Sequence, residues 1–175
     1  MGASAIGNII YSTLENIYSP LIDKVLTNED ISALEKIYPQ IVDEVFIEHY
    51  KESGNENGKK TIALHVIKKH IANLLKHEKE IIEELAKKKE TITLKHLEEN
   101  LTANVFVNTG GGPVPITLSG TIDRIDFTPS TFRIIDYKSS VKKEDHTFNI
   151  ESLSDVFTDT KYGKVLQLLV YAWLT

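Results

Sequence analysis

Two aspartates and a lysine in the stretch 120–140 are the residues of this sequence best suited to chemistry. Two segments rich in β-branched and aromatic residues flank the turn-forming sequence TPST there, which is typical of an antiparallel hairpin. With the turn centred in TPST, residues equally distant from it face each other, so Asp123 lies opposite Asp136. Because side chains alternate along a strand, Lys138 projects on the same face as Asp136. The sequence thus predicts a patch of two carboxylates and one ammonium group.

Such a patch suits a divalent cation. Two facing carboxylates are costly to keep ionised together, and a cation between them removes that cost. Hydrolysis of a phosphodiester requires a Lewis acid, a deprotonated water and a positive charge near the developing negative charge. Asp123, Asp136 and Lys138 with Mg²⁺ or Mn²⁺ would supply all three. A lone D-x-K on a strand is usually a surface ion pair, and the catalytic interpretation rests on the facing Asp123 together with the order of the sequence motifs described below.

The other charged residues of this hairpin have a structural interpretation. Arg124, Asp126 and Arg133 fall on the opposite face of the predicted strands. The same register puts Asp126 opposite Arg133, and Ile125 opposite Ile134. We therefore expect a cross-strand salt bridge away from the two facing carboxylates.

Composition limits the classes of protein to consider. The chain has 175 residues, of which 41% are hydrophobic and 26% are charged, and this predicts a single soluble globular domain. Its longest apolar segments are too short to span a bilayer and its N-terminus lacks a basic signal region, so we expect a cytoplasmic protein without membrane contact. The absence of cysteine excludes disulfides, zinc thiolate sites and iron–sulfur clusters. The net charge of -5 argues against autonomous nucleic-acid binding, although a local basic face or a basic partner can still provide it.

Three helices are expected before residue 90. The first, AIGNIIYSTLENIY, ends before Pro20 and has its apolar residues at helical spacing. The second begins at Thr27 or Asn28 and is broken or kinked at Pro39. The third region, after the surface loop KESGNENGKK, is one long helix or two. Its expected apolar stripe consists of Ile62, Val66, Ile67, Ile71, Leu74 and Leu75.

The periodicity changes at Thr91 from helical to strand-like. We expect strand segments separated by the glycine-rich sequence NTGGGPVP, which is better explained as a hairpin connection than as a phosphate-binding loop, because it lacks a following Lys-Ser/Thr and helix. A long polar connection follows the TPST hairpin. The final segment KVLQLLVYAWLT is helical, and Gln167 and Tyr171 share one of its faces.

At this point the chain resembles a known family. GTIDRID, IIDYKSS and LQLLVYA occur in the order typical of the RecB/AddB-type branch of the PD-(D/E)XK nuclease superfamily, and in particular of an AddB-like C-terminal exonuclease domain. IGNIIYSTLENIY resembles the first helix of that family. Gly7, Leu14 and Glu15 match its pattern there, whereas Tyr11 occupies the position of the family's histidine. A tyrosine is a poor substitute for an imidazole ligand, so we expect reduced metal affinity or a contribution from Glu15 or water.

The resemblance implies roles for individual residues. Asp123 and Asp136 would hold magnesium, and Lys138 would assist the attacking water or the charge of the transition state. Gln167 and Tyr171 would lie beside the site and hold DNA or the catalytic groups. The implied fold is α/β and restriction-endonuclease-like, with a mixed β-sheet flanked by helices.

The resemblance also implies a context for the domain. We expect one domain over residues 1–175, mainly helical over 1–90, with the sheet, the catalytic hairpin and the following helix over 91–175, as part of a longer chain. Its expected function is metal-dependent DNA cleavage, as an exonuclease of a recombinational repair helicase–nuclease with a helicase-related partner subunit. The alternative is a catalytically impaired DNA-binding or interaction domain that retains the fold. A stand-alone endonuclease is a third, weaker interpretation.

Overall fold

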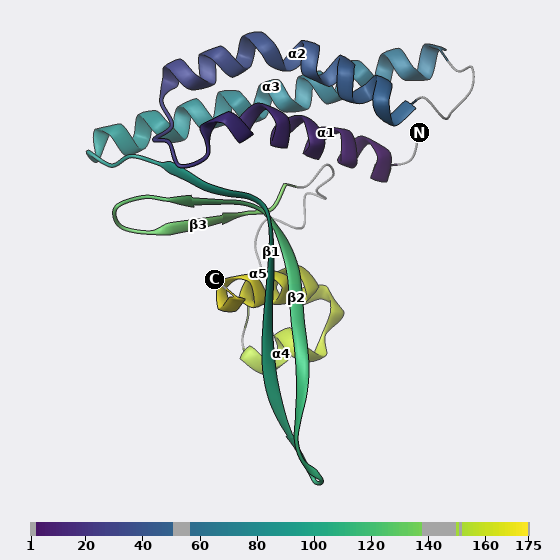
Figure 1. Cartoon of the computed structure of the whole chain (residues 1–175), viewed down its shortest axis with the longest axis vertical. Coiled ribbons are helices and arrows are strands. Elements are labelled where there is room, and N and C mark those ends of the chain that lie inside the picture. Colours follow the sequence, from purple (N-terminus) through teal and green to yellow (C-terminus); the bar gives the residue numbers. More distant parts are fainter. Residues whose placement is uncertain (1–2, 51–56, 138–149, 151, 175) are drawn as a thin grey trace.

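The first part of the chain forms a layer of three helices. The computed structural model describes residues 3–50, 57–137, 150 and 152–174. The three helices are α1 (Ala3–Tyr18), α2 (Asn28–Tyr50) and α3 (Asn57–Lys87). They lie side by side above the strands in Figure 1, and their inward faces form the larger hydrophobic core.

Helix α1 agrees with its sequence pattern. Ile10, Leu14 and Ile17 are buried in the core of the helical layer, and Ile6 packs at its border. The helix ends in the short 3-10 turn Ser19–Leu21, where proline is compatible with the first position. The amphipathic spacing therefore identified both the helix and its buried face.

Helix α2 begins with a reciprocal cap. The Asp30 N–H donates to Thr27 Oγ1 at 3.1 Å, and the Thr27 N–H donates to Asp30 Oδ2 at 3.0 Å. Pro39 lies inside the helix, which continues to Tyr50, so of the two predicted alternatives, a break or a kink, the break is wrong. The lost backbone hydrogen bond is outweighed because the turns after Pro39 bury Val42 and Phe46 in the core.

Helix α3 is a single helix of 31 residues. Its buried face includes Ile67, Ile71 and Leu75, as expected, but Ile62 and Val66 are 67% and 49% exposed. The buried residues recur every four positions, and they leave Ile62 and Val66 on the outer side of the helix. The predicted stripe was therefore too wide at its N-terminal end.

The described strands form one antiparallel sheet in the order β1-β2-β3. These strands are β1 (Thr93–Thr109), β2 (Gly112–Phe127) and β3 (Phe132–Ile135). Helices packed on this sheet give the expected α/β class. Backbone hydrogen bonds from Asp23 to Leu94 and from Leu26 to Ile92, at 2.7 and 2.8 Å, attach the start of the sheet to the loop between α1 and α2.

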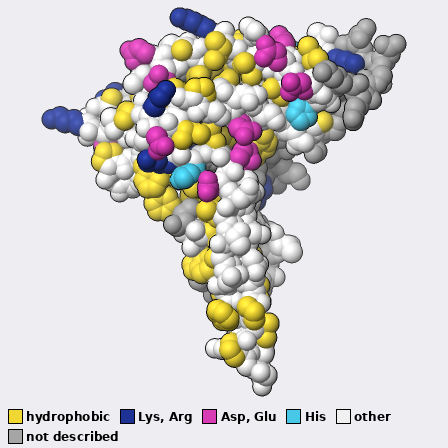
Figure 2. Space-filling view, viewed as in Figure 1, with side chains coloured by type: hydrophobic (Ala, Val, Ile, Leu, Met, Phe, Trp, Pro, Cys, Tyr) yellow, Lys and Arg dark blue, Asp and Glu magenta, His cyan; other side chains and the backbone are white. Residues whose placement is uncertain are grey.

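The outer parts of β1 and β2 extend away from the helical layer as a long arm, with α4 (Leu153–Thr158) and α5 (Gly163–Leu174) beside it (Figure 1). Thr109 pairs with Gly112 at its tip, so the glycine-rich sequence is a hairpin connection, as expected. Figure 2 shows hydrophobic and uncharged side chains along this arm, whereas the coloured charged side chains lie on the helical body. Among the described helices, none is both long and apolar enough to cross a membrane.

Strands β2 and β3 pair in the predicted register. Ile125 faces Ile134 and Asp126 faces Arg133, and the turn is closed by the Thr128 N–H donating to Thr131 O at 2.7 Å. This register is the one obtained by centring the turn in TPST. It places the two aspartates at the end of the ladder farthest from the turn.

Candidate active site

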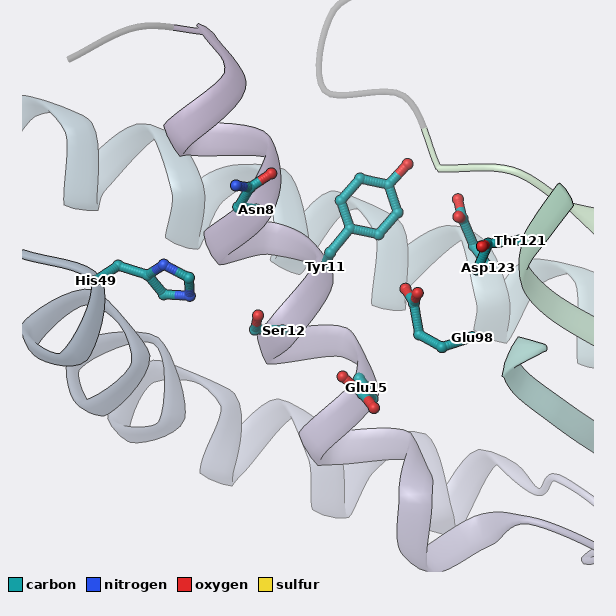
Figure 3. Close-up of a pocket in the computed structure, with 8 residues that line it drawn as sticks. All are labelled: Asn8, Tyr11, Ser12, Glu15, His49, Glu98, Thr121 and Asp123. Carbon is teal, nitrogen blue, oxygen red and sulfur yellow. The ribbon is translucent and has the colours of Figure 1, made fainter. Parts of the chain in front are cut away.

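A cleft lies between α1 and the strands at the point where the arm leaves the helical layer. Its volume is about 430 Å³. Figure 3 shows Tyr11 extending from α1 toward the strands that carry Glu98 and Asp123. The cleft is lined by Asn8, Tyr11, Ser12, Glu15, His49, Glu98, Thr121 and Asp123.

Asp123 and Asp136 both lie at the end of the β2–β3 ladder. The last pair of the ladder is Arg124 with Ile135, and the two aspartates are the next residues on each side. The Tyr137 N–H donates to Asp123 Oδ2 at 2.5 Å. Beyond the last backbone pair of the ladder, this side-chain hydrogen bond therefore links the two strands. Both carboxylates lie near the hydroxyl of Tyr11, whose pKa is raised by burial and further by their charges.

Tyr137 connects three parts of the site. Its N–H binds Asp123, its carbonyl oxygen accepts a hydrogen bond from the Tyr11 hydroxyl, and its own hydroxyl accepts one from Arg124 Nη1 at 3.3 Å. The rings of Tyr11 and Tyr137 meet edge to face with their centroids 6.4 Å apart. Burial, together with the charge of Asp123, raises the pKa of Tyr11, so this hydroxyl keeps its proton.

Glu98 is a cleft residue that the sequence motifs did not identify. It lies on β1 between the pairs Leu97–Arg124 and Glu99–Ile122, with a φ of 49°. Burial raises the pKa of Glu98, and the nearby charges of Asp123 and Glu15 raise it further. Counting back from a turn placed at the central glycines of NTGGGPVP would have put Glu98 opposite Asp123.

Arg124 lies at the centre of a buried charged network. Its Nη1 and Nη2 donate to the two carboxylate oxygens of Glu78 at 3.0 and 3.1 Å. Its Nε and Nη2 donate to the two oxygens of Asp126 at 2.7 and 2.9 Å. Arg133 Nη1 lies 3.6 Å from Asp126 Oδ2, which confirms the predicted cross-strand salt bridge.

This network explains why Asp126 is structural. Arg124 and Asp126 are both fully buried, and the Arg124 guanidinium also lies 4.6 Å from the centre of the Tyr18 ring. Burial raises the pKa of Asp126, and the paired Arg124 opposes this shift. Both carboxylate oxygens of Asp126 contact Arg124 or Arg133, so we assign this residue a structural role and not a role in the cleft.

Gln167 and Tyr171 lie on α5, outside the set of described residues that line the cleft. Gln167 Nε2 donates to the Tyr171 hydroxyl at 2.7 Å. The Tyr171 ring packs with Ile122 in a second, smaller hydrophobic cluster and lies directly against Gly120. Tyr171 therefore contacts the strand that carries Asp123, and Gln167 is linked to this strand through Tyr171. Lys138 lies outside the described residues.

The donor chemistry of Asp123 and Asp136 fits a magnesium ion. In the part of the chain that the structure describes, no three His, Asp or Glu side chains are arranged to hold a metal ion. Mg²⁺ in phosphate chemistry commonly takes one or two carboxylates and completes its shell with water and substrate phosphates. Asp123 lines the cleft and Asp136 directly follows the last pair of the same ladder, so these two carboxylates could supply the protein ligands of such an ion.

Comparison with known protein families gives a match over the whole chain. The family described as the PD-(D/E)XK nuclease superfamily matches residues 1–175. This range includes the helix with Tyr11, the hairpin with Asp123 and Asp136, and the helix with Tyr171. No curated protein and no solved structure matches the chain.

Proposed function

The chain belongs to the PD-(D/E)XK nuclease superfamily, and from this premise we propose that it hydrolyses DNA with a divalent metal ion held by Asp123 and Asp136. The observation that most supports this proposal is the position of these two aspartates directly after the last pair of the β2–β3 ladder, with Asp123 in the cleft and both charges acting on Tyr11. Because the chain belongs to a superfamily of nucleases, DNA is its expected substrate.

Each residue of the site would have a separate role in this reaction. When bound, Mg²⁺ or Mn²⁺ polarises a phosphoryl oxygen and lowers the pKa of a water molecule. Asp123 is already oriented by the Tyr137 N–H, so little reorganisation is required before it binds a cation. Lys138 would supply positive charge to the developing negative charge. Gln167 and Tyr171 would hold strand β2, and through it Asp123, in place.

A narrower proposal concerns the biological context. The order of GTIDRID, IIDYKSS and LQLLVYA supports an AddB-like exonuclease within a helicase–nuclease of recombinational repair, acting in the cytoplasm with a partner subunit. The net charge of -5 suggests that the partner supplies part of the basic surface for DNA. Cleavage of end-labelled linear DNA and of closed circular DNA distinguishes an exonuclease from an endonuclease, because an exonuclease leaves the circles intact.

Tyr11 favours a second candidate function. Its hydroxyl binds the Tyr137 carbonyl oxygen beside both aspartates, where a ligand of the cation would otherwise stand. A site filled in this way suits a DNA-binding or interaction domain that retains the nuclease fold with weak or no cleavage. Glu15, which lines the same cleft, is the candidate replacement for the missing imidazole.

The catalytic proposal is tested by the variant Asp136→Ala. We expect cleavage of labelled single- and double-stranded DNA with Mg²⁺ or Mn²⁺ to fall at least about 100-fold, since even outer-shell partners of a metal contribute about 10–100-fold. Asp23→Asn, which changes an exposed aspartate paired with Lys95, is the matched control and should cleave like the wild type. Equal rates for Asp136→Ala and wild type would refute metal-dependent cleavage at this site.

The variant Tyr11→His separates the two candidate functions. If Tyr11 alone weakens the site, histidine should raise cleavage and Mn²⁺ affinity about 10–100-fold. Tyr11→Phe, which removes only the hydroxyl, is the control for loss of the contact with Tyr137. If both variants bind DNA but neither they nor the wild type cleaves it, the non-catalytic candidate is the one that survives.

A further inference from the structure

Helix α3 reaches the candidate site through one buried side chain. Glu78 is only 5% exposed, and both of its carboxylate oxygens accept hydrogen bonds from Arg124. Arg124 directly follows Asp123 in the chain. Neither the motifs of the hairpin nor the pattern of α3 singles out Glu78.

The Arg124 guanidinium has no spare donor. It makes five hydrogen bonds, one for each of its N–H groups: two to Glu78, two to Asp126 and one to the Tyr137 hydroxyl. A planar fork with every donor used can adopt only one orientation. Arg124 is therefore locked from three directions, and Glu78 is the only one of these partners that lies on a helix.

The charges of the network balance. Glu78 and Asp126 supply two negative charges, and Arg124 and Arg133 supply two positive ones. Removing Glu78 would leave a buried excess of positive charge and two N–H groups of Arg124 without acceptors. Glu78 thus supplies two of the five acceptors that fix the orientation of Arg124 and its hydrogen bond to Tyr137.

Tyr137 transmits this orientation to the aspartates. Its hydroxyl is held by Arg124 and its N–H holds Asp123 Oδ2, while Asp136 is its direct neighbour in the chain. We propose that Glu78 is a positioning residue that sets the mutual placement of Asp123 and Asp136 through Arg124 and Tyr137. As an effect on cleavage, this inference rests on the proposed function. As an effect on geometry, it stands independently of that function.

Two variants of the full chain test the proposal, and both keep the shape of the side chain. Glu78→Gln removes the charge that orients Arg124. Tyr137→Phe removes only the hydroxyl that accepts a hydrogen bond from Arg124. The control is Ile67→Ala, which destabilises the buried face of α3 more than two turns away from Glu78. All measurements are made below the unfolding transition of each variant.

The first readout is the NMR signal of the Tyr137 amide, which reports its short hydrogen bond to Asp123 without any metal or DNA. We expect its downfield shift to be reduced in both Glu78→Gln and Tyr137→Phe, and to be retained in Ile67→Ala. The second readout is Mn²⁺ affinity, which should weaken about 10–100-fold in Glu78→Gln and remain unchanged in Ile67→Ala. The third is cleavage, where kcat should fall while KM for DNA stays the same.

The outcomes separate this proposal from the proposed function. A Tyr137 amide signal that is unchanged in both Glu78→Gln and Tyr137→Phe would overturn the positioning role, whether or not the wild type cleaves DNA. Equal changes in Ile67→Ala would also overturn it, because the effect would then be general destabilisation. If the wild type neither binds Mn²⁺ nor cleaves DNA, the proposed function fails, and the amide signal alone decides the role of Glu78.

Discussion

At the scale of single residues, Gly120 controls how closely α5 approaches β2. A β-carbon added to Gly120 would lie 2.6 Å from a ring carbon of Tyr171, which is closer than two carbon atoms can approach without a shift. Tyr171 is itself buried with Ile122 and hydrogen-bonded to Gln167, so its ring has little room to move. The glycine of GTIDRID and the tyrosine of LQLLVYA are thus two halves of one contact.

The variant Gly120→Ala should therefore be destabilised. We expect the free energy of unfolding to fall by about 1–3 kcal/mol, the usual cost of overpacking a well-packed core. Urea denaturation monitored by circular dichroism measures this change. Gly163→Ala is the matched control, because no heavy atom lies within 4 Å of an added β-carbon at this first residue of α5, and its stability should be unchanged or slightly higher. Equal stability of Gly120→Ala and wild type would contradict the contact.

At the scale of elements, helix termini and packing together decide where a helix begins and whether it continues. The reciprocal cap of Thr27 and Asp30 satisfies backbone donors at the start of α2. Pro39 would normally interrupt such a helix, yet α2 continues because its second half packs in the core. The start of α2 is therefore a local property, whereas its length depends on the other two helices.

The variant Thr27→Ala tests the local part of this account. It should lower the free energy of unfolding by about 1 kcal/mol, because the N–H of Asp30 loses its acceptor. Thr27→Ser keeps the hydroxyl and should retain most of the stability. Thermal unfolding of the three proteins measures the difference. If Thr27→Ala and Thr27→Ser were equally stable, the cap would have no energetic role.

At the scale of the whole molecule, two hydrophobic clusters of unequal size stabilise different parts of the chain. The larger one joins the three helices to Ile92 and Leu94 at the start of the sheet, and the smaller one joins Ile122, Ile125 and Tyr171 between β2 and α5. The outer half of the arm belongs to neither cluster, and Phe106 and Val114 near its tip are 68% and 46% exposed. Its backbone hydrogen bonds have little buried apolar surface to protect them.

Hydrogen exchange should reveal this division. Amides of the arm between Thr102 and Ser119 should exchange through local opening, at a free energy well below that of global unfolding. Amides of Ile67 and Ile71 in α3 should exchange only through global unfolding, because they lie in the larger cluster. Residue-resolved exchange measured by NMR distinguishes the two classes. Uniform protection of both segments would show that the arm is stabilised as strongly as the helical layer.

The sequence by itself determined the arrangement of the second hairpin. TPST is a short, well-defined turn, so one centre sets the register of β2 and β3, and the alternation of side chains then separates Asp123 from Asp126. The burial of Ile10, Leu14 and Ile17 likewise followed from their helical spacing in the sequence. In each case neighbouring residues in the chain carry the whole signal.

Only the tertiary structure decided the surroundings of that hairpin. Glu98 reached the cleft because the ladder between β1 and β2 starts at the middle of a glycine-rich sequence whose turn could have formed at several positions. Glu78 reached Arg124 because α3 packs against the sheet, and no periodicity along α3 encodes which strand residue it will meet. Tyr11 and the Tyr137 carbonyl oxygen are 126 positions apart in sequence. Contacts of this kind depend on how helices and strands pack together, which local patterns do not specify.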